Sequence, residues 1–200
     1  MQTIADARRK EAALSALGAS GTAATVPWAL NQLIGTKFKV VLGYQSSPDA
    51  GLAMERGEVN GTGSTSWDYL ETKRDWLDNK KITFLYTIAL SRYRGIPDVP
   101  TILELTDNDK DGRVLGLIAS GSTIGRSIVG TPGVPADRAA ALRRAFDAMV
   151  KDRDFLADAR QRHLGVDPLS GTNLQRIVAE IASAPDDIIA KMKAVTRQPK

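Results

Sequence analysis

The chain has 200 residues, of which 42% are hydrophobic and 25% charged, the balance of an ordinary globular protein of one or two domains. Its net charge is only +4 and its basic residues are mixed with acidic ones, which argues against a nucleic-acid-binding surface. It has no cysteine, which excludes disulfides and thiolate metal sites.

The first predicted elements are a strand and a helix. The stretch "AALSAL", residues 12–17, reads as a short buried strand that ends at Gly18. Residues 19–34 then show the apolar spacing of an amphipathic helix, which Gly35 ends. Pro27 fits such a helix only within its first turn.

A second strand and helix follow. The β-rich stretch "KFKVVLGY", residues 37–44, predicts a strand. Ser47 is a suitable N-cap for the next helix, Pro48 suits its first position and Gly57 ends it. The stretch "EVNGTGS", residues 58–64, predicts a third, short strand that runs into a loop.

The pattern then continues to residue 90. Residues 65–77 predict one helix, and the nearly continuous apolar run "KITFLYTIAL", residues 81–90, predicts a strand buried on both faces of a parallel sheet. Residues 14–90 therefore alternate βαβαβαβ, which predicts an α/β fold with a parallel sheet flanked by helices.

The second half of the chain is predicted to be mostly helical. After the proline-rich stretch 96–105, residues 109–121 predict a helix and residues 124–135 a strand followed by a turn. Beyond Pro135, four helices are indicated by apolar side chains at helical spacing. These are Leu142, Phe146, Met149 and Val150; Phe155 and Ala159; Leu174, Ile177, Val178 and Ile181; and Ile188, Met192 and Val195.

Small polar residues follow each of the first three predicted strands. The strands end in "GASGT", "GYQSSPD" and "GTGSTSW", and each leads into a predicted helix. Ligands of open parallel sheets bind beyond the carboxyl ends of the strands, and helix N-termini favour anions. The loops therefore indicate a carboxylate site, although such residues are equally common as helix caps and turns.

We expect this site to involve hydroxyl groups and backbone amides. The candidate ligand-binding residues are Ser20, Gly21, Thr22, Tyr44, Ser46, Ser47, Ala50 and Thr65, with Gly21 and Ala50 contributing their amides. Cation side chains play no part in this prediction, so each neutral hydrogen bond would contribute only about 0.5–1.5 kcal/mol.

Enzymatic chemistry is not indicated. The loop "GTGST" lacks the lysine of a phosphate-binding loop, and "GASGT" lacks the spacing of a nucleophile elbow. The single histidine, His163, is predicted to lie at a helix C-terminus, where a cation suits the helix dipole. We therefore predict no catalytic residue, no metal site and no cofactor.

Three segments together resemble a known family. These are "LNQLIGTKFKVVLGYQSSPDAGLAMERGEVNG", "PDVPTILEL" and the long stretch that opens with "GTPGVPADR". They are similar to the Bug-type periplasmic solute-binding receptors of tripartite tricarboxylate transporters, and the resemblance runs from about Asp6 to Val195.

The resemblance implies a Venus-flytrap fold of the type II periplasmic-binding-protein kind, with a small mono-, di- or tricarboxylate held between two lobes. Residues 12–123 would form the ligand-binding second lobe, and residues 124–200 the returning C-terminal part of the first. The family's glycine-rich "GYxGG" loop reads "GYQSS" here, with Ser46 and Ser47 in place of glycines. The implied partners are membrane transporter subunits and the implied location is the periplasm.

The resemblance also implies that the chain is shortened: it is a truncated gene product, a fragment or an unusual relative. The N-terminal stretch "MQTIADARRKEAALSALG" contains no signal peptide, and the first part of lobe one would be missing. The C-terminal helices would then expose an apolar face, which leaves self-association open. A ligand-sensing or protein-interaction module without a transport role remains the alternative.

Overall fold

The computed structural model describes residues 1–162 and 164–199. The chain forms two compact units. The first comprises Met1–Thr123 together with the segment that begins at Ala184, and the second comprises Ile124–Ser183. The assignment of residues 12–123 and 124–200 to two lobes stays a prediction.

A parallel sheet forms the centre of the first unit. Its strands are β1 (Ala12–Ala16), β2 (Phe38–Leu42) and β3 (Gly61–Thr62), in the order β2-β1-β3. Leu14 of β1 pairs with Val40 on one side and with Gly61 on the other. The first three predicted strands are confirmed, and because all three are parallel, their carboxyl ends lie at one edge.

Two helices connect these strands, α2 (Thr22–Ile34) and α3 (Ser47–Glu55). Gly35 ends α2 in the left-handed conformation, with φ of 72°. Pro27 lies inside α2, beyond the first turn in which it was expected. Because proline has no N–H, the carbonyl of Ala23, four residues earlier, lacks its usual helical donor.

A further helix, α1 (Ile4–Arg9), was not predicted. Six residues are too few to show a helical period, but the caps are readable in the sequence. Thr3 accepts from the Asp6 amide, and the Asp6 carboxylate accepts from the Thr3 amide in return. Ala7 of this helix is fully buried.

The single helix expected over residues 65–77 is two helices, α4 (Trp67–Glu71) and α5 (Arg74–Asp78). The hydroxyl of Thr72 donates to the carbonyl of Tyr69 at 2.6 Å, and Lys73 has φ of −109° and ψ of 50°. The backbone therefore leaves the helical conformation between the two segments.

The strand expected over residues 81–90 is wrong. Among the described residues the sheet has three strands, and this segment makes one isolated parallel bridge, between Thr87 and Thr101. Its side chains nevertheless pack on the core, Leu85, Tyr86 and Ile88 among them. The apolar run correctly indicated buried side chains, but an irregular segment can bury its side chains as well as a strand can.

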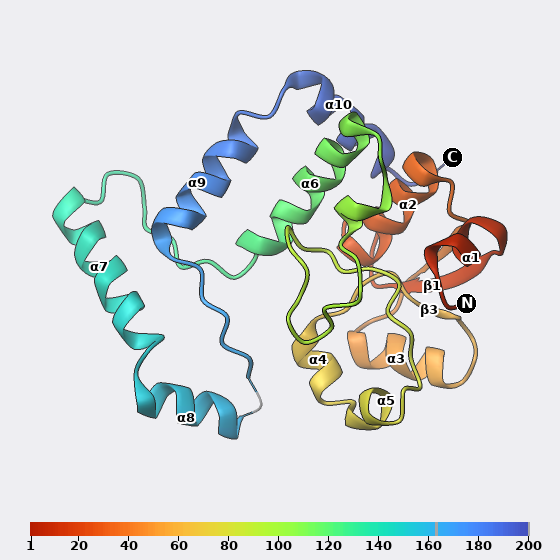
Figure 1. Ribbon diagram of the computed structural model, residues 1–200, viewed down its shortest axis with the longest axis horizontal. Helices are drawn as coiled ribbons and strands as arrows, with labels where there is room; N and C mark the ends of the chain where they lie inside the picture. The colour runs from red at the N-terminus through yellow and green to blue at the C-terminus, as the bar shows by residue number, and fades with distance from the viewer. Residues whose placement is uncertain (163, 200) are drawn as a thin grey trace. The chain divides into compact units, whose positions relative to one another are not determined.

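The remaining elements of the first unit are the 3₁₀ helix η1 (Ile102–Leu105), α6 (Asp109–Ile124) and α10 (Asp186–Val195). Figure 1 shows α2, α6 and α10 above the strands in its view, and α3, α4 and α5 below them. A partly buried ion pair between Asp111 and Lys191 joins α6 to α10. The helix predicted over residues 109–121 is confirmed.

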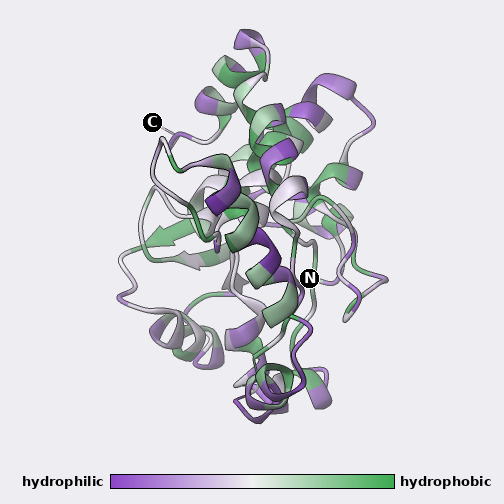
Figure 2. Cartoon of the chain, turned by 90° about the vertical axis from the view of Figure 1, so that its left-hand side faces the viewer, coloured by the Kyte–Doolittle hydropathy of each residue, from purple (hydrophilic) through white to green (hydrophobic). Residues whose placement is uncertain are grey.

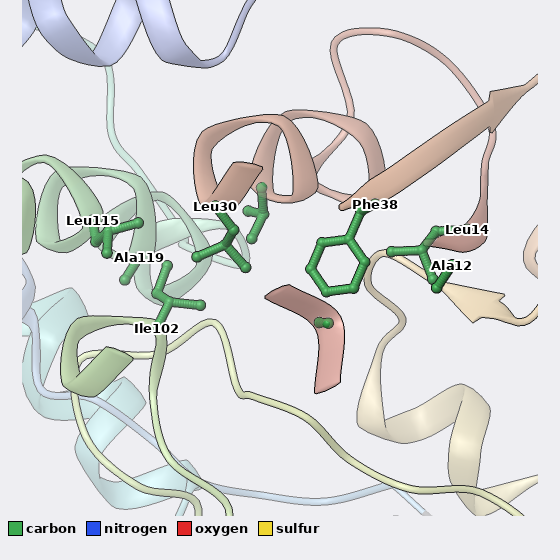
Figure 3. Packing of buried hydrophobic residues seen from close by; sticks show 9 residues of the cluster. Ala12, Leu14, Leu30, Phe38, Ile102, Leu115 and Ala119 are labelled. Atoms are coloured by element: carbon green, nitrogen blue, oxygen red, sulfur yellow. The ribbon is translucent and has the colours of Figure 1, made fainter. Parts of the chain in front are cut away.

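The main hydrophobic core lies between the sheet, α2 and α6. Figure 3 shows side chains from β1, β2, α2, η1 and α6 converging there, among them Phe38, Leu30 and Leu115. Leu30, Ile102 and Leu115 are fully buried. Figure 2 shows hydrophobic and hydrophilic residues interleaved along individual helices, as expected of helices that bury one side.

The second unit contains α7 (Ala136–Met149), α8 (Arg153–Gln161) and α9 (Gly171–Ala182), so the helices predicted there are confirmed. The strand predicted within residues 124–135 is wrong, because the structure gives that part of the chain no strand. Ile128 and Val129 are each 81% exposed, and Leu142 is 65% exposed.

Candidate functional site

The candidate site lies at the carboxyl edge of the sheet. The loops after β1, β2 and β3 all begin at this edge, because the three strands are parallel. Since β1 is the central strand, its loop lies between the other two. The topology therefore brings together the three polar segments that the sequence singled out.

Direct contacts join the loop after β1 to the loop after β3. The hydroxyls of Thr22 and Ser64 are hydrogen-bonded at 2.7 Å. Gly63 lies so close to the first turn of α2 that a Cβ there would come within 1.9 Å of the Ala23 oxygen and 2.7 Å of the Pro27 side chain. Only glycine permits this approach, so Gly63 fixes the distance between the two loops.

The N-terminus of α2 is open to an anion. Its N-cap is Gly21, which has no side chain to accept from the helix, and its first turn contains no acidic residue. Helix geometry leaves the amides of Thr22 and Ala23 without intrahelical acceptors. These two amides and the positive end of the helix dipole would attract and bind an anion at the site.

The other two helix N-termini are already capped. Ser46 is the N-cap of α3; its oxygen accepts from the Asp49 amide, and its hydroxyl donates to the Asp49 carboxylate at 2.7 Å. Ser66 likewise caps α4, with Asp68 in the first turn. Each of these two helix N-termini therefore already has a carboxylate in its first turn. The expectation that Ser47 is the N-cap is wrong, since Ser47 is the first helical residue.

The loop after β3 contains an unusual hydroxyl. The side-chain oxygen of Thr65 is buried and has no hydrogen-bond partner within the described chain, and the same holds for the hydroxyl of Tyr69. Burial raises the pKa of Tyr69, so its hydroxyl stays protonated. A buried hydroxyl without a partner is costly, which makes Thr65 a candidate to bind a ligand or a water.

The eight predicted site residues are all at or near this edge, but they differ in availability. Ser20, Gly21 and Thr22 are exposed, Tyr44, Ser46, Ser47 and Thr65 are half-buried, and Ala50 is buried. The amides of Gly21 and Ala50, which were expected to bind ligand, already donate to the carbonyls of Gly18 and Ser46. As a ligand-binding set these residues stay a prediction.

Sequence reasoning missed Ser64. It lies within "GTGSTSW", but nothing in that run of small residues distinguishes it from its neighbours. Its contact with Thr22 depends on the close approach of Gly63 to α2. A local sequence pattern cannot predict this approach, because the two segments are far apart in the chain.

Aromatic residues pack beside the third loop. The rings of Trp67 and Tyr93 are 4.9 Å apart, and Trp67 donates its indole N–H to Glu71 at 3.0 Å. Trp28 is buried in the core. These contacts give the aromatics structural roles.

Residues 1–162 and 164–199 contain neither a candidate metal cluster nor a candidate membrane span. The described part of the chain has no group of three or more histidine, cysteine or acidic residues placed to hold a metal ion. None of its helices is both long and apolar enough to cross a bilayer. The prediction for His163 concerns a residue outside the described ranges.

Comparison with known proteins identifies the fold. The chain matches no family model and no curated protein. It is similar to the crystal structure, without ligand, of a TctC solute-binding protein from Polaromonas, with a TM-score of 0.61 and 18% identity. The match covers 96% of this chain but only 58% of that protein. The chain therefore has the fold of a TctC solute-binding protein, the periplasmic-binding-protein fold that the resemblance implied.

Proposed function

We propose that the chain binds one carboxylate of a small organic anion at the N-terminus of α2. The amides of Thr22 and Ala23 would donate to the carboxylate oxygens, with the hydroxyls of Thr22, Ser64 and Thr65 around them. The role is that of a non-enzymatic receptor that delivers its ligand to the membrane subunits of a tripartite tricarboxylate transporter, in the periplasm.

The observation that carries the proposal is the contrast between α2 and its neighbours. The N-termini of α3 and α4 are capped by serine side chains and carry first-turn acids, whereas α2 has a glycine cap and no such acid. An anion is therefore favoured at α2 alone among the three. The similarity of the fold to a TctC solute-binding protein supports a solute-binding role.

The site contains no cationic side chain among the residues proposed to bind, so its affinity depends on neutral donors. Each such hydrogen bond contributes about 0.5–1.5 kcal/mol. Three or four of them give a binding free energy of about 4 kcal/mol, which corresponds to a millimolar dissociation constant.

The test is a titration of the chain with succinate and with citrate, followed by amide NMR shifts. We expect shifts at residues 18–25 and 62–66, and a roughly fivefold weaker affinity in Thr22→Val, which removes one hydroxyl. Thr83→Val is the matched control, because the Thr83 hydroxyl donates to Gln2, away from the loops. Shifts confined to the C-terminal basic helices would indicate non-specific anion binding and overturn the proposal.

A second role, protein interaction, is favoured by the second unit. Its side chains Ile128, Val129 and Leu142 are more than 60% exposed, and α7 buries none of its residues. Exposed apolar groups of this kind indicate a surface that packs against another polypeptide. Self-association of the chain is the form of this interaction that we propose.

A further inference from the structure

The candidate loop after β3 receives a hydrogen bond from a distant part of the chain. The hydroxyl of Tyr86 donates to the carbonyl oxygen of Gly63 at 2.7 Å. Tyr86 belongs to the apolar segment that sequence analysis predicted as a strand and that the structure shows to be irregular. The segment thus has a specific contact with the loop that the sheet does not explain.

Tyr86 is well placed to hold this loop. Its side chain packs against the main core cluster, which contains Leu14, Val26 and Ile102. Burial raises the pKa of Tyr86, so the hydroxyl stays protonated and remains a donor. Because its ring packs on the core, the Tyr86 hydroxyl can hold the Gly63 carbonyl in a fixed position.

The Gly63 residue, in turn, is held from several sides. Its amide donates to the Ser15 carbonyl of β1 at 3.4 Å, and its Cα lies against the Ala23 carbonyl of α2. The neighbouring Thr62 hydroxyl lies 3.0 Å from the Ser64 carbonyl and donates to it. Of these restraints, the Tyr86 bond alone comes from outside the sheet, its loops and α2.

We propose that Tyr86 is a positioning residue for the carboxylate site. It acts through the Gly63 carbonyl, which it holds so that the Ser64 hydroxyl meets the Thr22 hydroxyl. This inference rests on the proposed function, but its structural part concerns the loop of the free protein and is testable without ligand.

The experiment compares the wild-type chain with Tyr86→Phe, which keeps the ring and removes only the hydroxyl. In the free protein, we expect amide NMR shifts at Gly63, Ser64, Thr65 and Thr22, about 20 residues or more from the substitution in sequence. With succinate as the probe, we expect about fivefold weaker binding, the effect of one hydrogen bond.

Ile102→Val is the control, because it loosens the same core cluster without touching the loop. We expect it to lower the melting temperature and leave the succinate affinity within twofold of wild type. Equal losses of affinity in Tyr86→Phe and Ile102→Val would mean general loosening of the core and would overturn the inference.

The two proposals fail in different ways. If wild-type protein does not respond to succinate, the proposed function fails, and the free-protein shifts alone decide the role of Tyr86. If those shifts stay near residue 86 and leave Gly63–Thr65 unchanged, Tyr86 does not position the loop, whatever the ligand does.

Discussion

Replacing Gly63 by alanine tests the close packing on which the candidate site depends. The added Cβ would lie 1.9 Å from the Ala23 oxygen, 2.7 Å from the Pro27 side chain and 2.8 Å from the Ala23 carbonyl carbon. Two of these three atoms are backbone atoms of α2, which cannot rotate away. The loop after β3 or the first turn of α2 must therefore move by about 1 Å or more, in an interior that is otherwise close-packed.

The expected cost follows from two opposing terms. Overpacking of this kind costs about 1–3 kcal/mol of unfolding free energy. Replacing glycine by alanine also stiffens the unfolded chain, which gives back about 0.4–1 kcal/mol where the native backbone suits alanine. Gly63 is not among the glycines with positive φ, so this gain applies. The steric cost is larger, and we expect a net loss of about 1–2 kcal/mol of unfolding free energy.

Urea denaturation followed by circular dichroism measures this loss. Gly112→Ala is the matched control, because Gly112 lies in α6 with open space around its would-be Cβ. There the substitution should raise the unfolding free energy by about 0.5–1 kcal/mol, the helix preference for alanine over glycine. A Gly63→Ala protein as stable as wild type would refute the packing argument, and with it the fixed distance between Thr22 and Ser64.

Two further predictions concern stability and association. The Arg92 guanidinium, bonded to the Glu104 carboxylate at 2.6 Å, and the Thr101 amide lower the pKa of Glu104 from 4.5 to about 2. A depressed carboxyl pKa stabilises the fold above pH 4.5 and ceases to do so as the pH falls towards 2. The melting-temperature difference between wild type and Glu104→Gln should therefore shrink over this window, and a constant difference would contradict the ion pair's role. In sedimentation velocity, we expect the sedimentation coefficient to rise with protein concentration and Leu142→Glu to abolish the rise; a concentration-independent monomer would rule out the proposed self-association.

The elements that sequence predicted best are those with a regular side-chain period. The helices over residues 136–149 and 171–182 and the strands Ala12–Ala16 and Phe38–Leu42 are examples. In the two helices, apolar side chains recur at helical spacing, and the two strands are short apolar or β-rich runs of strand length. The same stretches are bounded by residues with local capping or turn chemistry, such as Gly35 at the end of α2.

The two wrong strand predictions concern segments in which the side chains gave no information about backbone pairing. Residues 81–90 are rich in apolar residues and residues 124–135 include the β-branched pair Ile128 and Val129, yet neither segment forms a regular strand in the described chain. The two segments fail differently, since Leu85 and Ile88 pack on the core while Ile128 and Val129 are 81% exposed. A strand needs a neighbouring strand with free hydrogen-bonding groups, and an apolar run cannot show whether one is present.

The sequence was sufficient to predict where the candidate site lies, but not which atoms in it are available to bind a ligand. Parallel strands bring loops to one edge, so polar junctions at residues 18–22, 43–49 and 61–67 had to meet there. Whether a serine hydroxyl in such a junction caps its own helix or faces a ligand depends on one or two backbone angles. Ser46 is engaged by Asp49, whereas Thr22 reaches across to Ser64. The opening left by Gly21 is a better guide than the hydroxyls, because a helix start without a capping side chain and without an acid keeps its amides for another acceptor.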